Sequence, residues 1–207
     1  MKKLFILAIV ITAAISSAFM ISPAFDELAL NAAMPESGYK MKDVSGKDIS
    51  LDEAKTAKGL LVIFSCNTCP YVKLSETRIK DYSDFCAANG IGCIIVNSNE
   101  AQRGEEDSFD AMTKYHATQK LKCFYTVDAG SKLANAFGAT RTPQCFLFNG
   151  KVLVYKGAID DNVKDQTAVK ETYLKDALNA VVKNTVPAKQ ETKSIGCTIK
   201  RVEYINS

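Results

Sequence analysis

Histidine is nearly absent from this chain, because His116 is the only one among its 207 residues. The Cys-x-x-Cys pattern also occurs only once, at Cys66 and Cys69. A structural zinc site usually takes four Cys or His ligands from two such pairs, so the sequence disfavours a zinc site here. Two interpretations of the pair remain, a redox-active dithiol and an inert structural pair.

Long runs of one charge are absent as well. The chain carries 26 basic and 23 acidic residues, a formal net charge of +3, and its basic residues form no run. Binding to a phosphate backbone needs clustered Lys and Arg, so we expect no nucleic-acid partner. Seven cysteines are too few for a disulfide-stapled scaffold of this length, and their odd number leaves at least one unpaired.

The N-terminus has the pattern of an export signal. A basic start, Met1–Lys3, precedes the uncharged residues 4–21, and small residues follow. We predict a signal peptide over residues 1–24, with a retained N-terminal membrane anchor as the alternative. The mature protein would then be periplasmic or exported from a bacterium, with one domain over residues 25–187 and a tail over residues 188–207. Disulfides persist in such a compartment unless something reduces them.

The chain is organised around the stretch that holds the two cysteines. An apolar run, residues 59–64, leads into Cys66, Cys69 and Pro70, and a segment with helical periodicity follows. Proline is tolerated only in the first turn of a helix, so the helix should begin within three residues of Pro70. Cys66 would then face the positive end of the helix dipole, which favours a thiolate and makes Cys66 the predicted nucleophile. Cys69, one turn in and more buried, would resolve the mixed disulfide.

Hydrophobic periodicity predicts an α/β fold with a central mixed sheet flanked by helices. Strand, helix and strand with short connections imply a parallel pair, and Asn149-Gly150 indicates a hairpin. The polar residues 97–107 should form a loop over the carboxyl edge of the sheet. The expected strands cover residues 59–65, 91–96, 121–127, 144–148 and 151–156, after a hairpin within 39–51; the expected helices cover residues 70–89, 108–119, 131–137 and 168–183.

Four stretches carry a resemblance to a known family: residues 64–72, Thr142-Pro143, residues 157–162 and residues 196–200. Together they resemble the thioredoxin superfamily, and more closely the peroxiredoxin-like branch of the redoxins. That branch groups with the alkyl hydroperoxide reductase/thiol-specific antioxidant family. The resemblance implies a thioredoxin-like fold in which the Thr142–Pro143 peptide bond is cis and offers backbone groups to a substrate segment beside Cys66.

The resemblance implies a thiol–disulfide oxidoreductase that needs no organic cofactor and no metal. Cys66 would attack a disulfide of a substrate protein, and Cys69 would release the product. The substrates would be disulfide- or dithiol-containing proteins, and a second redox protein, reducing or oxidising, would restore the pair. Membrane contact is expected only if residues 1–24 are retained.

The sequence departs from the family pattern at two places. Thioredoxins often carry a buried acid in the strand before the dithiol, which is missing here, so water, Lys58 or Glu76 would accept the proton of Cys69. Peroxiredoxins have Thr three residues before the reactive cysteine, where this chain has Ile63. This weakens the alternative of a peroxidase acting through Cys66, although Arg141 could stabilise a thiolate.

The remaining cysteines have different surroundings. Cys86, Cys93, Cys123 and Cys145 lie in apolar segments and are predicted to be core residues. Cys197 lies in a short apolar motif of an otherwise polar tail, and is expected either to reach back as a third redox thiol or to be idle on a docked tail.

A copper carrier resembling Sco-type chaperones is a lesser alternative, with Cys66, Cys69 and His116 as ligands. His116 shares a helix face with Phe109 and Met112, however, which indicates a core position.

Overall fold

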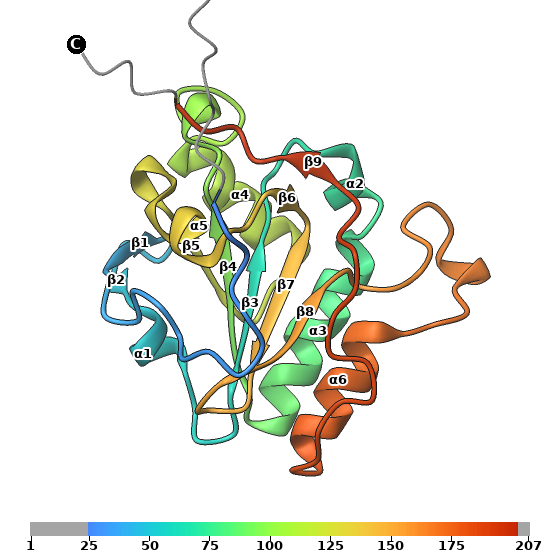
Figure 1. Cartoon of the computed structure of the whole chain (residues 1–207). Coiled ribbons are helices and arrows are strands. Elements are labelled where there is room, and N and C mark those ends of the chain that lie inside the picture. Colours follow the sequence, from blue (N-terminus) through green and yellow to red (C-terminus); the bar gives the residue numbers. More distant parts are fainter. Residues whose placement is uncertain (1–24, 203–207) are drawn as a thin grey trace, which may run out of the picture.

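The computed structural model describes residues 25–202 (Figure 1), so the predicted signal peptide or anchor at residues 1–24 lies outside the described residues. Its main sheet has seven strands in the order β2-β1-β5-β4-β3-β7-β8. The parallel strands are β3 (Leu60–Phe64), β4 (Gly92–Asn97) and β5 (Phe124–Val127). Antiparallel strands complete the sheet: β1 (Met41–Asp43), β2 (Asp48–Ile49), β7 (Gln144–Phe148) and β8 (Leu153–Gly157). The predicted central mixed sheet is confirmed.

Helices cover both faces of this sheet (Figure 1). All five residues of β3 are buried, so its alternating side chains feed two separate apolar layers. One layer packs against α3 (Glu76–Asn89), α4 (Phe109–Gln119) and α6 (Tyr173–Val182). The other packs against α1 (Leu51–Ala54), α5 (Lys132–Phe137) and the lead-in segment before β1. The two layers fix β3 at the centre of the fold, and with it the segment that follows β3.

The predicted single helix over residues 70–89 is wrong, because the structure divides it into α2 (Pro70–Lys73) and α3. The cause is Arg78, whose Nη2 donates to the carbonyl of Leu74 at 2.9 Å and to Ser75 Oγ at 3.4 Å. In an unbroken helix the Leu74 carbonyl would accept from the backbone N–H of residue 78. The side chain of Arg78 takes its place, and the helix is interrupted at Leu74 and Ser75.

The predicted start of the last helix at residue 168 is also wrong, since α6 begins at Tyr173. A short 3-10 turn, Gln166–Ala168, precedes it and is capped by Asp165, which accepts from the Thr167 N–H at 2.8 Å. Asp161 accepts from the Lys170 N–H at 2.9 Å and closes the loop on itself. These local side-chain bonds compete with helix formation.

The C-terminal tail docks along the domain. The N–H of Lys156 in β8 donates to Gln190 at 2.9 Å, and the Thr192 N–H donates to Lys156 at 3.0 Å. Further on, β9 (Cys197–Thr198) pairs antiparallel with the short strand β6 (Arg141–Thr142). The tail therefore runs from β8 to the end of the molecule where β6 and α2 lie (Figure 1).

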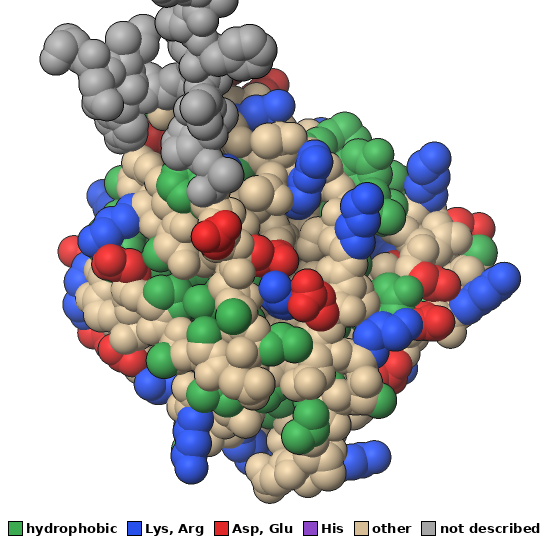
Figure 2. Space-filling view, viewed as in Figure 1, with side chains coloured by type: hydrophobic (Ala, Val, Ile, Leu, Met, Phe, Trp, Pro, Cys, Tyr) green, Lys and Arg blue, Asp and Glu red, His purple; other side chains and the backbone are tan. Residues whose placement is uncertain are grey.

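Among residues 25–202, no helix is long and apolar enough to cross a bilayer. The face seen in Figure 2 carries basic and acidic side chains interspersed, with no broad area of one sign. That distribution agrees with the balance of 26 basic and 23 acidic residues in the sequence.

Candidate active site

The two cysteines of the Cys-x-x-Cys motif follow the central strand directly. Cys66 lies two residues after β3, and Cys69 is the N-cap of α2, with Pro70 as the first helical residue. The sequence predicted that Cys69 lies one turn into the helix and is more buried than Cys66. This is wrong, because Cys69 lies at the start of the helix. Cys66 is 1% and Cys69 3% exposed, so both cysteines are buried and neither is the solvent-exposed member of the pair.

Thr142 contacts both sulfurs from the facing segment. Its Oγ1 lies 3.6 Å from Cys66 Sγ, and its carbonyl accepts from the Cys69 thiol at 3.1 Å. The Thr142–Pro143 peptide bond is cis, which confirms that prediction. The structure thus brings together four of the predicted residues, Cys66, Cys69, Thr142 and Pro143, although their spacing in the chain is 73 residues or more between the cysteines and Thr142.

Within the pair, the pKa of Cys69 is lowered and the pKa of Cys66 is raised. The first cause for both is the hydrogen bond between them, in which the Cys66 thiol donates to the Cys69 sulfur. Burial and the nearby carboxylate of Asp107 further raise the pKa of Cys66, whereas hydrogen bonds from Cys197 and Thr142 further lower that of Cys69. The side chain of Thr142 lowers the pKa of Cys69, but its backbone carbonyl acts in the opposite direction. The carbonyl accepts from the Cys69 thiol and cannot donate to a thiolate, so it opposes ionisation of Cys69. The balance is the reverse of the acidic Cys66 that the sequence predicted.

Cys197 is the third cysteine at this site. It lies opposite Thr142 in the β6–β9 pair and packs against the apolar layer that contains Cys66 and Cys69. Its thiol hydrogen-bonds to the Cys69 sulfur, and burial and that bond raise its pKa to about 11. The structure therefore shows a docked tail with Cys197 beside Cys69, and both options for Cys197 fit this position.

Arg141 does not point at the sulfurs. Successive residues of a strand face opposite sides, and in β6 Thr142 is buried while Arg141 is exposed. Its Nη1 donates to Thr198 Oγ1 at 3.1 Å and to the Gly196 carbonyl at 3.4 Å. The expectation that Arg141 stabilises a thiolate is therefore corrected: its guanidinium binds the tail.

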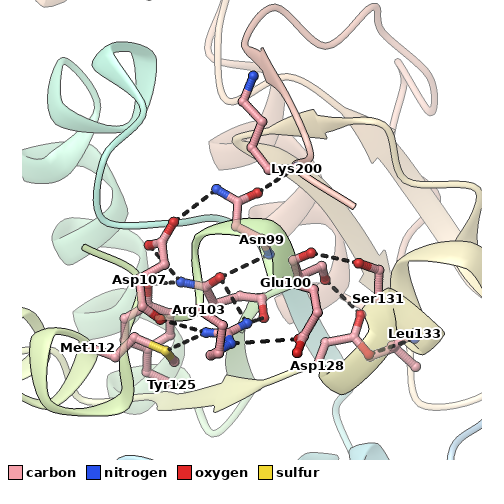
Figure 3. A network of polar contacts seen from close by, with 12 residues as sticks. Asn99, Glu100, Arg103, Asp107, Met112, Tyr125, Asp128, Ser131, Leu133 and Lys200 are labelled. Atoms are coloured by element: carbon pink, nitrogen blue, oxygen red, sulfur yellow. Dashed lines mark hydrogen bonds and ion pairs between the residues drawn. The ribbon is translucent and has the colours of Figure 1, made fainter. Parts of the chain in front are cut away.

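A buried polar network around Asp107 and Asn99 (Figure 3) extends to the loop between the two cysteines and holds it. Asp107 Oδ1 accepts from the Asn67 N–H at 2.8 Å and from Asn97 Nδ2 at 2.9 Å, and its Oδ2 accepts from Asn99 Nδ2 at 3.0 Å. The Tyr125 hydroxyl donates to Asn67 Oδ1 at 2.8 Å. Because Asp107 is fully buried, these bonds fix the loop and place a negative charge near Cys66.

The sequence predicts a polar loop over the sheet edge at residues 97–107, but not that its side chains form a buried network. Asn97 is the last residue of the buried strand β4, Ser98 and Asn99 directly follow it, and all three polar residues are buried. Buried polar side chains need hydrogen-bond partners, so this run was the available signal. Arg103 completes the network by donating to the Asn97 carbonyl at 2.7 Å.

The two proton acceptors predicted for Cys69 each have a hydrogen-bond partner other than Cys69. Lys58 precedes β3, and its Nζ donates to the Asn89 carbonyl at 2.8 Å, at the edge of the sheet opposite Cys69. Glu76 hydrogen-bonds to Tyr115.

The ligand set of the copper-carrier alternative is not assembled. His116 Nε2 lies 2.8 Å from the carbonyl of Cys123, which precedes β5, whereas Cys66 and Cys69 follow the end of the parallel strand β3. In the described part of the chain, no three His, Cys, Asp or Glu side chains converge as metal ligands. The prediction that Cys86, Cys93, Cys123 and Cys145 are core residues is confirmed by their burial.

Two solved structures share most of this fold at higher identity. One is a hypothetical protein SMc02350 from Sinorhizobium meliloti 1021, 29% identical over 86% of this chain and 97% of its own, with a TM-score of 0.77. The other is an uncharacterized conserved protein from Geobacillus kaustophilus, 25% identical over 84% of this chain and 93% of its own, also with a TM-score of 0.77.

A thioredoxin-like protein in the oxidized form is similar in fold. It is 19% identical over 76% of this chain and 99% of its own, with a TM-score of 0.60. A search of curated proteins found no significant match. The family model described as Redoxin matches residues 29–174, which span β1 to the start of α6 and include the Cys-x-x-Cys motif and Thr142-Pro143. The chain therefore belongs to the Redoxin family and has a thioredoxin-like fold.

Proposed function

We propose that the chain is a thiol–disulfide oxidoreductase whose reactive centre is the Cys66/Cys69 pair. The observation that carries the proposal is the contact of these two thiols with each other and with Thr142 of the cis Thr142–Pro143 bond. Two sulfurs in hydrogen-bond contact can close a disulfide with little movement of the backbone. Membership of the Redoxin family supports the same chemistry.

In the proposed reaction, a thiolate of the pair attacks a substrate disulfide. One new S–S bond forms to the substrate, the substrate S–S bond breaks, and its second sulfur leaves as a thiolate that takes up a proton. The other thiol of the pair loses its proton and attacks the mixed disulfide, which releases the reduced substrate and leaves a Cys66–Cys69 disulfide. Two electrons pass to the substrate, and a second dithiol protein returns the pair to its starting state.

The order of attack follows from which sulfur is ionised. The hydrogen bonds from Cys66, Cys197 and Thr142 favour a Cys69 thiolate while the tail is docked. The helix position predicted from the sequence favoured Cys66 instead. We propose that Cys69 is the ionised sulfur of the resting dithiol, and that Cys66 is protonated.

The substrate we propose is a protein segment rather than a small thiol. Two exposed apolar side chains, Leu74 at the end of α2 and Ile195 in the tail, are 51% and 52% exposed. Ile195 lines a small cavity together with Pro143. Exposed apolar side chains at the end of α2 and next to Pro143 favour contact with polypeptide.

The test is a redox titration of the pair in glutathione buffers, with thiols trapped by alkylation and read by mass spectrometry. A reversible two-electron couple confined to the tryptic peptide 59–73, which contains Cys66 and Cys69, is the expected result. Cys145→Ser is the matched control, because Cys145 is a fully buried cysteine of strand β7 outside the Cys-x-x-Cys motif, and its loss should leave the couple in place. The absence of a disulfide at every potential would overturn the proposal.

We also propose that the protein works after export, with residues 1–24 removed or retained as an anchor. The basic start and the uncharged residues 4–21 support this. The test is to express the chain in a bacterium and determine the mass of the protein recovered from periplasm, membrane and cytoplasm. Recovery of the uncut chain from the cytoplasm alone would contradict export.

A thiol peroxidase is the second candidate, favoured by one contact. The sequence lacks Thr three residues before Cys66, but the hydroxyl of Thr142 lies 3.6 Å from Cys66 Sγ and fills a similar place. In that reaction Cys66 becomes a sulfenic acid, which condenses with Cys69 and releases water. We expect the reduced protein to consume peroxide slowly; fast trapping of a Cys66 sulfenic acid would favour the peroxidase instead.

A further inference from the structure

The tail covers the strand beside the dithiol. The Cys197–Thr198 strand, β9, pairs with β6, and the Ile199 N–H donates to the Thr140 carbonyl at 3.1 Å. Without the tail, β6 would present unpaired backbone groups next to both sulfurs. An exposed strand edge of this kind accepts an extended segment as an additional strand. In this structure the segment is supplied by the chain itself.

At Gly196 the backbone of the tail packs closely against the backbone of Thr142. A Cβ at Gly196 would lie 2.2 Å from the Thr142 carbonyl oxygen, the same oxygen that accepts from the Cys69 thiol at 3.1 Å. Only glycine fits at this position while β9 stays in place. The next residue, Cys197, is thereby held opposite Thr142 with its side chain toward the layer that contains Cys69.

We propose that the tail is an intramolecular substrate: residues 195–199 occupy the position of an extended, cysteine-containing polypeptide segment, and Cys197 exchanges disulfides with Cys69. This inference rests on the proposed oxidoreductase function and names its substrate class. The substrate segment is extended, pairs antiparallel with β6, and carries a small residue directly before its cysteine.

The exchange conserves disulfide bonds and needs no external oxidant. Starting from the oxidised pair, the Cys197 thiol loses its proton and its sulfur attacks Cys69 Sγ. The Cys66–Cys69 bond breaks, the Cys69–Cys197 bond forms, and Cys66 leaves as a thiolate that takes up the proton. The burial and the Cys69 hydrogen bond that raise the pKa of Cys197 keep it protonated while the pair is reduced.

The contacts that hold the tail link it to the dithiol loop. The Lys200 N–H donates to Asn99 Oδ1 at 2.9 Å, and Asn99 Nδ2 donates to Asp107 (Figure 3). Asp107 in turn accepts from the Asn67 N–H. Ile199 is 3% exposed and anchors the strand in the other apolar layer. A substrate segment would have to displace β9, which pairs with only two residues of β6.

The first experiment maps disulfides in the Cys66→Ser variant of the full chain after oxidation with oxidised glutathione. Cys66 and Cys69 share the tryptic peptide 59–73, whereas Cys197 lies on peptide 194–200. We expect the 59–73/194–200 cross-link to become the major disulfide, and the Cys66→Ser/Cys197→Ser double variant to lack it. If Cys66→Ser yields no such cross-link while the wild-type pair still titrates reversibly, the inference is overturned and the oxidoreductase stands. If the wild-type pair forms no disulfide, the proposed function itself fails.

The second experiment uses Gly196→Ala, which keeps every cysteine but pushes the tail off Thr142. We expect about a tenfold faster reduction of a disulfide-linked peptide of sequence Ser-Ile-Gly-Cys-Thr-Ile-Lys, because local opening no longer limits access to the pair. The matched peptide with Ala in place of Gly should react more slowly. Gly38→Ala is the matched control, since a Cβ there meets nothing within 4 Å. An unchanged or slower rate for Gly196→Ala, with an unchanged melting temperature, would show that the tail does not occupy the substrate position.

Discussion

At the scale of single residues, the ionisation of the Cys66/Cys69 pair depends on groups that lie far from it in the chain. The apolar run, the Cys-x-x-Cys spacing and Pro70 were enough to place Cys66 and Cys69 between strand and helix. Which thiol is acidic depends on Thr142, Cys197 and Asp107, and these come from three other parts of the chain. No local pattern reports them, so the raised pKa of Cys66 and the lowered pKa of Cys69 could not be predicted from the sequence.

Cys66→Ala should raise the pKa of Cys69 toward the ordinary thiol value of about 8.5. The bond from the Cys66 thiol is the first cause of the lowered pKa, and the variant removes that donor. The measurement is the rate of iodoacetamide alkylation of Cys69 against pH, read on peptide 59–73. Alkylation requires the thiolate, so the midpoint should move to higher pH. Cys197→Ala, which removes a smaller cause, should move it less; an unmoved midpoint in Cys66→Ala would contradict the assignment.

Asp107→Ala should destabilise the protein by about 2–4 kcal/mol, because each of the buried donors left unsatisfied costs about 1–3 kcal/mol and the cavity relaxes in part. The carboxylate is fully buried and accepts from Asn67, Asn97 and Asn99. Urea unfolding measures the loss. Glu105→Ala removes an exposed carboxylate from the same loop and should change the free energy of unfolding by less than about 0.5 kcal/mol. Equal effects of the two changes would show that the network contributes nothing.

At the scale of elements, the sequence predicted which segments are strands and helices better than where they end. The strands β3, β4 and β7 follow from apolar runs. The division between α2 and α3 has no such signal. It depends on Arg78 bonding to Leu74 and to residues 160–163, which no helical periodicity encodes.

Arg78→Ala should cost about 3–5 kcal/mol of stability, because it leaves the buried Asp160 carboxylate without its partner. Arg78 Nη1 lies 2.6 Å from Asp160 Oδ2, and the two side chains are 6% and 4% exposed. The expected result is a lower urea midpoint with an unchanged slope. Lys80→Ala breaks a half-exposed ion pair with Asp84 on the same helix and should cost less than about 0.5 kcal/mol. A loss in Arg78→Ala no larger than in this control would contradict the role given to the pair.

At the scale of the whole molecule, the fold class was predictable because local alternation and β-α-β order restrict it to few topologies. The docking of the tail was foreseen only as one of two options for Cys197. Its evidence in the structure is a two-residue ladder between β6 and β9, whose partners Thr142 and Cys197 are far apart in the chain. Pairing over such a distance follows from complementary surfaces of the finished fold, and the sequence of the tail alone does not contain them.

Alkaline pH should unfold the whole domain through its buried tyrosines. Burial is the largest cause that raises the pKa of four tyrosines, Tyr82, Tyr115, Tyr125 and Tyr155. They lie on α3, α4, β5 and β8 respectively, and all four belong to or pack against the same apolar layer. The unfolded chain releases these protons near pH 10, while the folded chain retains them. The stability is therefore complete below about pH 10, and falls above it by about 1.4 kcal/mol per pH unit for each tyrosine until the raised folded pKa is reached.

Tyr155→Phe isolates one of these contributions. Its hydroxyl donates to the Ala158 carbonyl at 2.5 Å and contacts Thr192 Oγ1 at 2.8 Å, so the variant is less stable at neutral pH, but that loss does not depend on pH. Urea unfolding at several pH values between about 9 and 11.5 should give parallel stability curves below about pH 10. Above about pH 10, the curve of the variant should fall less steeply than wild type by about 1.4 kcal/mol per pH unit. Ionisation from the remaining tyrosines and thiols is common to both proteins and cancels in the difference. Curves that stay parallel over the whole range, or phenolate absorbance that rises fully while the circular dichroism stays native, would contradict the burial that links this tyrosine to the stability of the whole fold.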